Sequence, residues 1–149
     1  MAPWAPPTSL PSDAPADDLA ATCTQLFIGT GGSNRIISLD LTRSNHLLWM
    51  LSMYGNAQAV ALRGNLLLVG GHFRWVPDLR LHRNVDRFHF AVVDLNGQLQ
   101  YDWVPSFSGQ IRTGVWDILV SGPQIWVGGG YTNVSGDQHW GIASFTDAP

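Results

Sequence analysis

The sequence predicts an all-β protein built from repeated antiparallel sheets, and three observations support this fold class. The eight cationic residues are all Arg and the eleven anionic residues are all Asp, so the chain lacks Lys and Glu, two of the best helix formers. The 16 Gly and 9 Pro residues also disfavour helices. Short runs rich in Val, Ile, Leu and aromatic residues are separated by turn sequences such as Arg63-Gly64 and Asn96-Gly97.

Length and composition indicate one globular domain covering residues 1–149. With 45% hydrophobic and 13% charged residues, the chain can bury a core without disulfides or metals, so we expect no cofactor and no metal. A net charge of −3 disfavours nucleic acid as a partner, and no run reaches the roughly 18 apolar residues of a membrane span. No signal peptide is visible. The single cysteine, Cys23, has no second thiol to pair with.

Three segments of the chain align without gaps, and each reads as strand, tight turn, strand and glycine. They are residues 19–29, 60–70 and 118–128. A further apolar run follows each of them, at 36–40, 90–94 and 142–146. Asp40 and Asp94 occupy the same place in these runs, which favours a turn-capping role over catalysis.

Tryptophan marks the same repeat. Trp4 and Trp103 each precede a proline by two residues, and Trp49 lies alone between them, which gives a period of about 50 residues. The units are 4–48, 49–102 and 103–149. The second unit contains four strand-like runs, at 57–62, 66–73, 88–95 and 98–103. Four antiparallel strands per unit are typical of a β-propeller blade, so we predict about three such blades. The alternatives are a meander of three sheets or a sandwich.

Residues 115–145 resemble the YVGG-x-F-x-x-V-x-G repeat of bacterial surface propellers, the delta-60 and Kelch-like group. Residues 67–73, residues 94–99 and the Trp103-Val-Pro105 step are similar to the same repeat. The first unit departs from it, because residues 29–34 replace the longer loop. The resemblance implies a β-propeller at the cell surface or outside the cell, and it specifies fold better than function.

Three blades are too few to close a ring, since single-chain propellers have four to eight. The last unit also ends after its third strand. We therefore expect either a longer chain or a homo-oligomer to complete the propeller, and a dimer would supply six blades.

Loop lengths place any local function on one rim of the molecule. The turns within each strand pair are short, whereas the connections that emerge on the opposite rim are long. The longest, 74–87, holds half of the arginines. We predict that this connection binds a carboxylate, a sulfate or a glycan through Trp75, Arg80, His82, Arg83 and Arg87. The alternative is that these residues pair with Asp78 and Asp86 and cover a seam between blades.

The equivalent connection of the third unit adds Asp137, His139 and Trp140 to the predicted ligand-binding residues. We expect the other tryptophans to be structural: Trp116 and Trp126 within the sheets, and Trp4, Trp49 and Trp103 between blades. His72 and His89 flank the long connection and are expected to approach each other, but their spacing is not that of a metal motif.

No catalytic motif is present, and no catalytic residue is predicted. The function expected is that of a non-catalytic propeller module of a surface or secreted protein, which binds a protein or glycan partner through its long loops. One alternative is a lectin with repeated sugar sites. Another is a subunit or fragment of a propeller glycosidase or lyase.

Overall fold

The computed structural model describes residues 15–44, 46–109 and 113–146. Strands make up 59% of these residues, no helix occurs among them, and each pair of strands is antiparallel. The all-β, antiparallel prediction is confirmed. Trp4, at which the first unit was predicted to begin, lies outside the described residues, as do the last three residues of the third unit.

Sheet 1 has four strands that follow one another in chain order. They are β1 (Ala16–Ala21), β2 (Gln25–Thr30), β3 (Arg35–Asp40) and β4 (His46–Ser52). The turn after β3 is closed by Asp40, whose carboxylate accepts the amide of Thr42 at 2.8 Å and its hydroxyl at 2.6 Å. Trp49 lies inside β4.

Sheets 2 and 3 each have three strands in the same sequential order. Sheet 2 consists of β5 (Ala57–Arg63), β6 (Leu66–Gly71) and β9 (Phe90–Asp94). Sheet 3 consists of β11 (Val115–Ser121), β12 (Gln124–Gly129) and β15 (Ile142–Thr146).

The fourth strand that the sequence predicts for the second unit, at 98–103, is reduced to one bridge between Leu99 and Val93. The amide of Gln100 still donates to the Val92 carbonyl, but from Tyr101 onward the chain leaves the sheet. Asp94 caps the preceding turn, as predicted, because its carboxylate accepts the amides of Asn96 and Gln98.

The three sheets share one irregularity of register. The pairing of the first strand with the second shifts between residues 16 and 18 in β1, between 57 and 59 in β5, and between 115 and 117 in β11. Just beyond the shift, a glycine of the second strand pairs with both neighbours: Gly29 in sheet 1, Gly70 in sheet 2 and Gly128 in sheet 3. This register defines corresponding positions in the three sheets.

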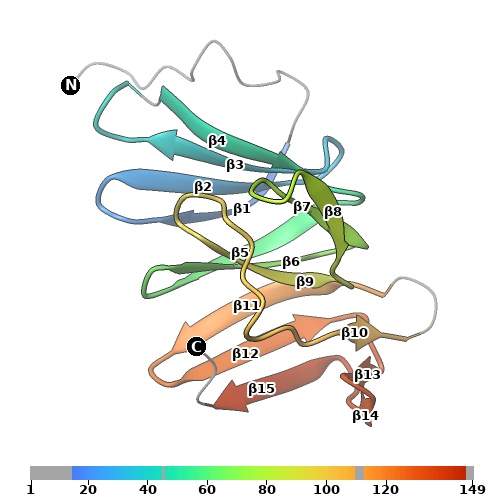
Figure 1. Cartoon of the computed structure of the whole chain (residues 1–149). Helices are drawn as coiled ribbons and strands as arrows, with labels where there is room; N and C mark the ends of the chain where they lie inside the picture. Colours follow the sequence, from blue (N-terminus) through green and yellow to red (C-terminus); the bar gives the residue numbers. More distant parts are fainter. Residues whose placement is uncertain (1–14, 45, 110–112, 147–149) are drawn as a thin grey trace.

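The sheets stack in chain order, with sheet 2 in the middle (Figure 1). One core cluster joins sheets 1 and 2, and a second joins sheets 2 and 3. Along β6, Leu67 and Val69 belong to the first core and Leu68 to the second, because successive side chains of a strand point to opposite faces. A sheet covered on both faces needs apolar residues without alternation, which explains the run from Leu66 to Val69.

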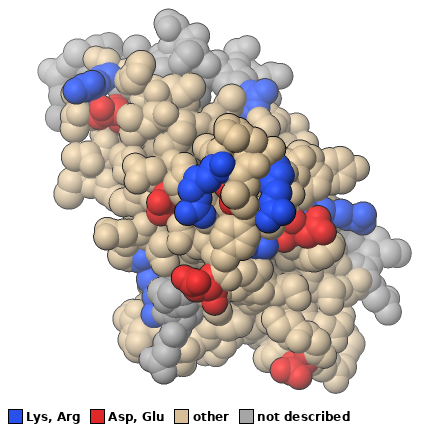
Figure 2. Space-filling view, viewed as in Figure 1, with Lys and Arg blue, Asp and Glu red and all other residues tan. Residues whose placement is uncertain are grey.

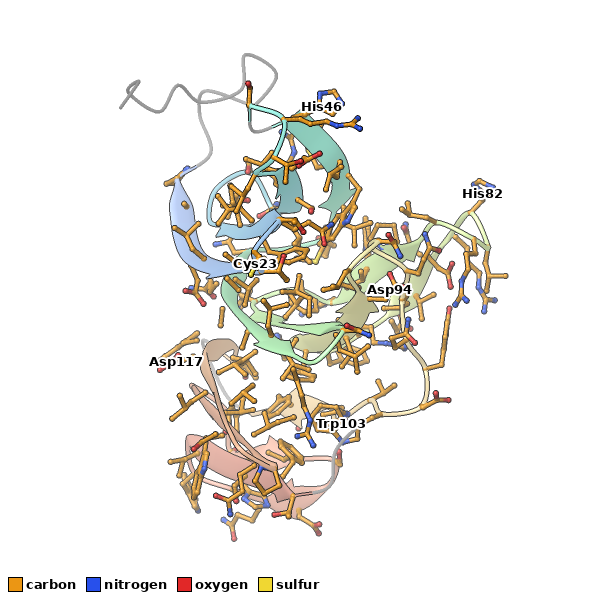
Figure 3. The ribbon with its side chains drawn as sticks, turned by 90° about the vertical axis from the view of Figure 1, so that its left-hand side faces the viewer. Cys23, His46, His82, Asp94, Trp103 and Asp117 are labelled. Atoms are coloured by element: carbon orange, nitrogen blue, oxygen red, sulfur yellow. The ribbon has the colours of Figure 1, made fainter. Side chains whose placement is uncertain are left out.

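Two of the tryptophans lie between sheets, as predicted. Trp49 packs against the first core and Trp103 against the second, where its ring makes edge contacts with Phe90 and Phe145. Figure 3 shows Trp103 between the two sheets. Trp116 and Trp126 lie in β11 and β12, within sheet 3 as predicted, but their side chains are exposed, whereas packing residues were expected.

The turns between the first and second strands of the sheets lie on one side of the stack, and the longer connections lie on the other (Figure 1). We call the second side, formed by residues 53–56, 72–89, 107–108 and 130–141, the long-loop rim. Its connections contain short strands of their own. These are β7 (Trp75–Asp78), β8 (Arg83–Asp86), β10 (Phe107–Ser108), β13 (Asn133–Val134) and β14 (Asp137–Gln138).

Candidate functional site

The longest rim connection folds as the hairpin β7–β8, which is anchored to the core at its base. Val76 is fully buried in the core between sheets 1 and 2, and it pairs with Val85. Asp78 ends β7 and shapes the turn, because its carboxylate accepts the amides of Arg80 at 2.8 Å and Leu81 at 3.0 Å. The chain then turns at His82, whose φ is 48°. His82 therefore projects from the tip of the hairpin (Figure 3).

Tyr101, from a different part of the chain, binds the buried carboxylate of Asp78. The hydroxyl of Tyr101 donates to the second oxygen of Asp78 at 2.5 Å. This bond holds the pKa of Asp78 below its ordinary value and raises the pKa of Tyr101. Asp78 is 1% exposed and uses both oxygens within the protein, which fits a structural role.

Two arginines of this connection bind the backbone of residues 99–100, at the edge of sheet 2. Arg80 donates to the carbonyl of Leu99 at 3.1 Å, and Arg87 donates to that of Gln100 at 3.2 Å. Arg87 is buried, it also bonds the Asp86 carbonyl, and its guanidinium lies 4.9 Å from the Tyr101 ring centre. Burial lowers its pKa. These bonds satisfy carbonyls at the edge of sheet 2. Nε of Arg80 also lies 4.0 Å from Oδ1 of Asp78, an ion pair that the alternative interpretation of this connection predicts.

The solvent-facing part of the hairpin is cationic, and its first residue belongs to an aromatic pair. Arg80 keeps more than half of its side chain exposed, and Arg83 and His82 are exposed as well. Figure 2 shows cationic atoms in two groups on this face of the molecule. Trp75 stacks on Tyr54, with ring centres 5.8 Å apart and an interplanar angle of 16°.

Tyr54 was not predicted from the sequence. It follows β4 in the short connection 53–56, and its amide donates to the carbonyl of Trp75 at 3.4 Å. No local sequence pattern marks Tyr54 as a partner of the hairpin, because it lies in a different connection. Only the stacking of sheets 1 and 2 brings it to Trp75.

The other predicted site residues lie on a second hairpin. Asp137 and Trp140 are exposed on or just after β14, and His139 is half-buried. This hairpin pairs with β10 in a sheet separate from β7–β8. Figure 1 shows both hairpins on the long-loop rim, the second beside sheet 3. The predicted residues therefore form two groups and not one continuous site.

His72 and His89 approach each other, as predicted, with ring centres 5.6 Å apart. His89 is buried, its φ is 69°, and its Nδ1 has no hydrogen-bond partner among the described residues. Burial, and then the charge of His72, lower the pKa of His89. In the part of the chain that the structure describes, no three His, Cys, Asp or Glu side chains are grouped to hold a metal ion.

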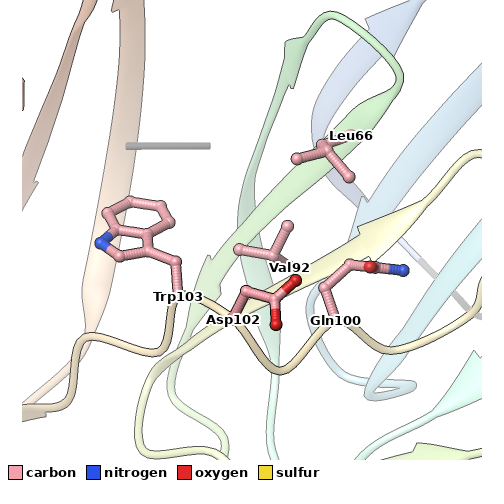
Figure 4. A pocket seen from close by; sticks show the side chains of 5 residues that line it. All are labelled: Leu66, Val92, Gln100, Asp102 and Trp103. Carbon is pink, nitrogen blue, oxygen red and sulfur yellow. The ribbon is translucent and has the colours of Figure 1, made fainter. Parts of the chain in front are cut away.

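A small cavity lies beside sheet 2, near Trp103 (Figure 4). Leu66, Val92, Gln100, Asp102 and Trp103 line its volume of about 60 Å³. Ligand pockets usually measure roughly 300–1,000 Å³, so this space is too small for a ligand of ordinary size. It does not compete with the rim as a binding site.

Neither the protein-family models nor the curated proteins give a match to this chain. No membrane-spanning helix is found in the described ranges. The described residues form an all-β structure.

Proposed function

We propose that this chain is a non-catalytic β-propeller module that binds an anionic protein or glycan partner at its long-loop rim. Three structural features support the propeller arrangement. The sheets are stacked in chain order, their strands are also in chain order, and the first strand of sheet 2, β5, contacts both β1 and β11. The resemblance to bacterial surface propellers extends the proposal to a place at the cell surface or outside the cell.

The observation that carries the binding role is that Arg80 and Arg83 are exposed on the same hairpin whose first residue, Trp75, stacks on Tyr54. A guanidinium offers forked donors that match a carboxylate or a sulfate, and an indole face can pack against a sugar ring. The nearest buried carboxylate, Asp78, is occupied by the Tyr101 hydroxyl and two backbone amides. Nε of Arg80 lies 4.0 Å from the same carboxylate, and 57% of the Arg80 side chain stays exposed to solvent.

The test is binding of the full chain to immobilised heparin and to an array of sulfated, sialylated and neutral glycans. The double variant Arg80→Ala/Arg83→Ala is compared with Arg43→Ala/Arg63→Ala, which removes the same charge elsewhere. Arg43 is 80% exposed in the turn after β3, and Arg63 lies beside the β5–β6 turn.

We expect the rim variant to lose at least tenfold in affinity, while the control stays within about twofold, because only the rim arginines form directional contacts. Melting temperatures check that the lost bond from Arg80 to Leu99 has not unfolded the hairpin. Equal losses in the two variants would show a non-specific charge effect. That result, or binding to none of the probes, would overturn the proposal.

A further inference from the structure

The outer face of sheet 3 presents a contiguous apolar surface. Leu119 of β11 pairs with Trp126 of β12, and Ile142 of β15 pairs with the neighbouring Gly128. Leu119 is 59% exposed, Trp126 37% and Ile142 60%. Large apolar side chains placed together on one sheet face indicate a surface that another element covers.

The corresponding positions of the other sheets show what covers such a face. The counterparts of Trp126 are Phe27 in sheet 1 and Leu68 in sheet 2, and both are fully buried against the next sheet in the stack. The counterparts of Ile142 are Ile36 and Phe90, which are also fully buried there. At both interfaces between sheets of this chain, therefore, this face packs against the first strand of the next sheet.

The shared glycine gives an independent indication of the same contact. A Cβ on Gly29 would lie 2.9 Å from the Ala57 carbonyl oxygen, and one on Gly70 would lie 2.3 Å from Cγ1 of Val115. Both glycines are needed because the first strand of the next sheet approaches their backbone closely. At Gly128 the nearest described atom is the Cβ of Asp117, 3.9 Å away and in the same sheet. Position 128 thus carries the same glycine as positions 29 and 70, although no strand of another sheet approaches it among the described residues.

The chain itself carries a face that matches. The residues that lie over the two glycines are Val60, with Cγ1 at 3.4 Å from the Gly29 position, and Ile118, with Cδ1 at 3.2 Å from the Gly70 position. Their counterpart in β1 is Leu19, which is 56% exposed on the face of sheet 1 that points away from sheet 2. Ile37 and Leu39 of β3 lie on the same face and are buried, so β1 is the strand that this face leaves open.

A polar contact follows the same pattern. Asp18 of sheet 1 accepts the amide of Val60 in sheet 2 at 2.8 Å. Its counterpart in sheet 3 is Asp117, which is exposed and projects outward from β11 (Figure 3). The amide in sheet 1 that corresponds to that of Val60 is the amide of Leu19, which donates to Oδ1 of the adjacent Asp18 at 2.8 Å. Sheets 3 and 1 therefore share the apolar half of the pattern, and Asp117 supplies a carboxylate on sheet 3.

We propose that the outer face of sheet 3 docks onto sheet 1 of a second copy of this chain, with Leu19 of the second copy over Gly128. The contact is head to tail, so it generates a ring if the rotation closes, and two copies would place six sheets in one ring. This inference rests on the propeller arrangement proposed above, but it does not depend on the binding role of the rim.

The experiment measures the molar mass of the full chain by light scattering over a range of concentrations. Gly128→Val fills the open position without strain in the isolated chain, because its Cβ meets only Asp117 at ordinary contact distance. Leu19→Asp disrupts the opposite face. Leu81→Asp, at an exposed leucine in the β7–β8 turn, is the matched control. Circular dichroism and melting temperature verify that each variant is folded.

We expect the natural chain and Leu81→Asp to be dimers, and Gly128→Val and Leu19→Asp each to be monomers. Mixing these two variants should restore association, since one of the two interfaces then has both faces intact. A monomeric natural chain would overturn the proposal, as would a dimeric Gly128→Val. Loss of the dimer in Gly128→Val but not in Leu19→Asp would mean that sheet 3 packs on itself, and would also overturn it. Heparin binding by the monomeric variants is read separately, so it tests the rim alone.

Discussion

Trp49 connects sheets 1 and 2 by packing and by a hydrogen bond, and Trp49→Phe separates the two contributions. The indole Nε1–H donates to the Leu95 carbonyl at 2.9 Å, and the ring lies 5.9 Å from that of Phe27. Phe retains the aromatic contact with Phe27 but removes the donor. The Leu95 carbonyl still accepts from Gln25 at 3.2 Å, so it is not left without a partner.

The loss is therefore one net hydrogen bond, about 1 kcal/mol, and the smaller ring adds about 1 kcal/mol of lost burial. For a domain of this size, about 2 kcal/mol corresponds to a fall in melting temperature of roughly 4–8 °C. Differential scanning calorimetry measures this shift. Trp140→Phe is the control, because Trp140 is 73% exposed and the chemical change is the same. If Trp49→Phe melts within a degree or so of Trp140→Phe, the reasoning about this inter-sheet contact is refuted.

Three further predictions concern packing and ionisation. Gly70→Ala places a Cβ 2.3 Å from Cγ1 of Val115 and should reduce the free energy of unfolding by about 1–3 kcal/mol in urea titrations; an unchanged midpoint would contradict the packing argument. Burial lowers the pKa of His89 from 6.5, so its stabilisation is fully present above pH 6.5 and is lost as the pH falls through the lowered value. His89→Asn, which tolerates the φ of 69°, should flatten the pH dependence of the urea midpoint between neutral and mildly acidic pH, and an unaltered dependence would assign it to other groups. Burial raises the pKa of Tyr131 to about 12, so near-ultraviolet titration should show a late phenolate step that disappears in Tyr131→Phe, provided the chain stays folded.

The strands and turns of the three sheets could be predicted because their signals are local. The runs around Gly29, Gly70 and Gly128 alternate with tight turns, and Asp40 and Asp94 cap turns a few residues away. Two strand assignments needed information from elsewhere. The chain at 98–103 leaves sheet 2 after one bridge, and the long rim connection forms a hairpin although Pro77 interrupts its strand pattern.

The candidate site was predictable in position but not in the roles of its residues. An excess of arginine in the longest connection indicates the rim, yet it does not distinguish Arg87, which is buried, from Arg83, which is exposed. That difference depends on Tyr101, which reaches Asp78 from another part of the chain. Tyr54 was missed for the same reason, since its stacking with Trp75 is a tertiary contact.

The burial of both faces of sheet 2 has a consequence for how the chain folds. Its strands β5 and β6 are joined by a tight turn, so this hairpin forms from local contacts before sheets 1 and 3 cover it. During that interval the run Leu66–Gly71 exposes apolar side chains on two sides, without a charge or a proline to oppose association with other chains. Refolding yield should therefore fall as protein concentration rises. Leu68→Asp would reduce this association, but it would also disrupt the core between sheets 2 and 3.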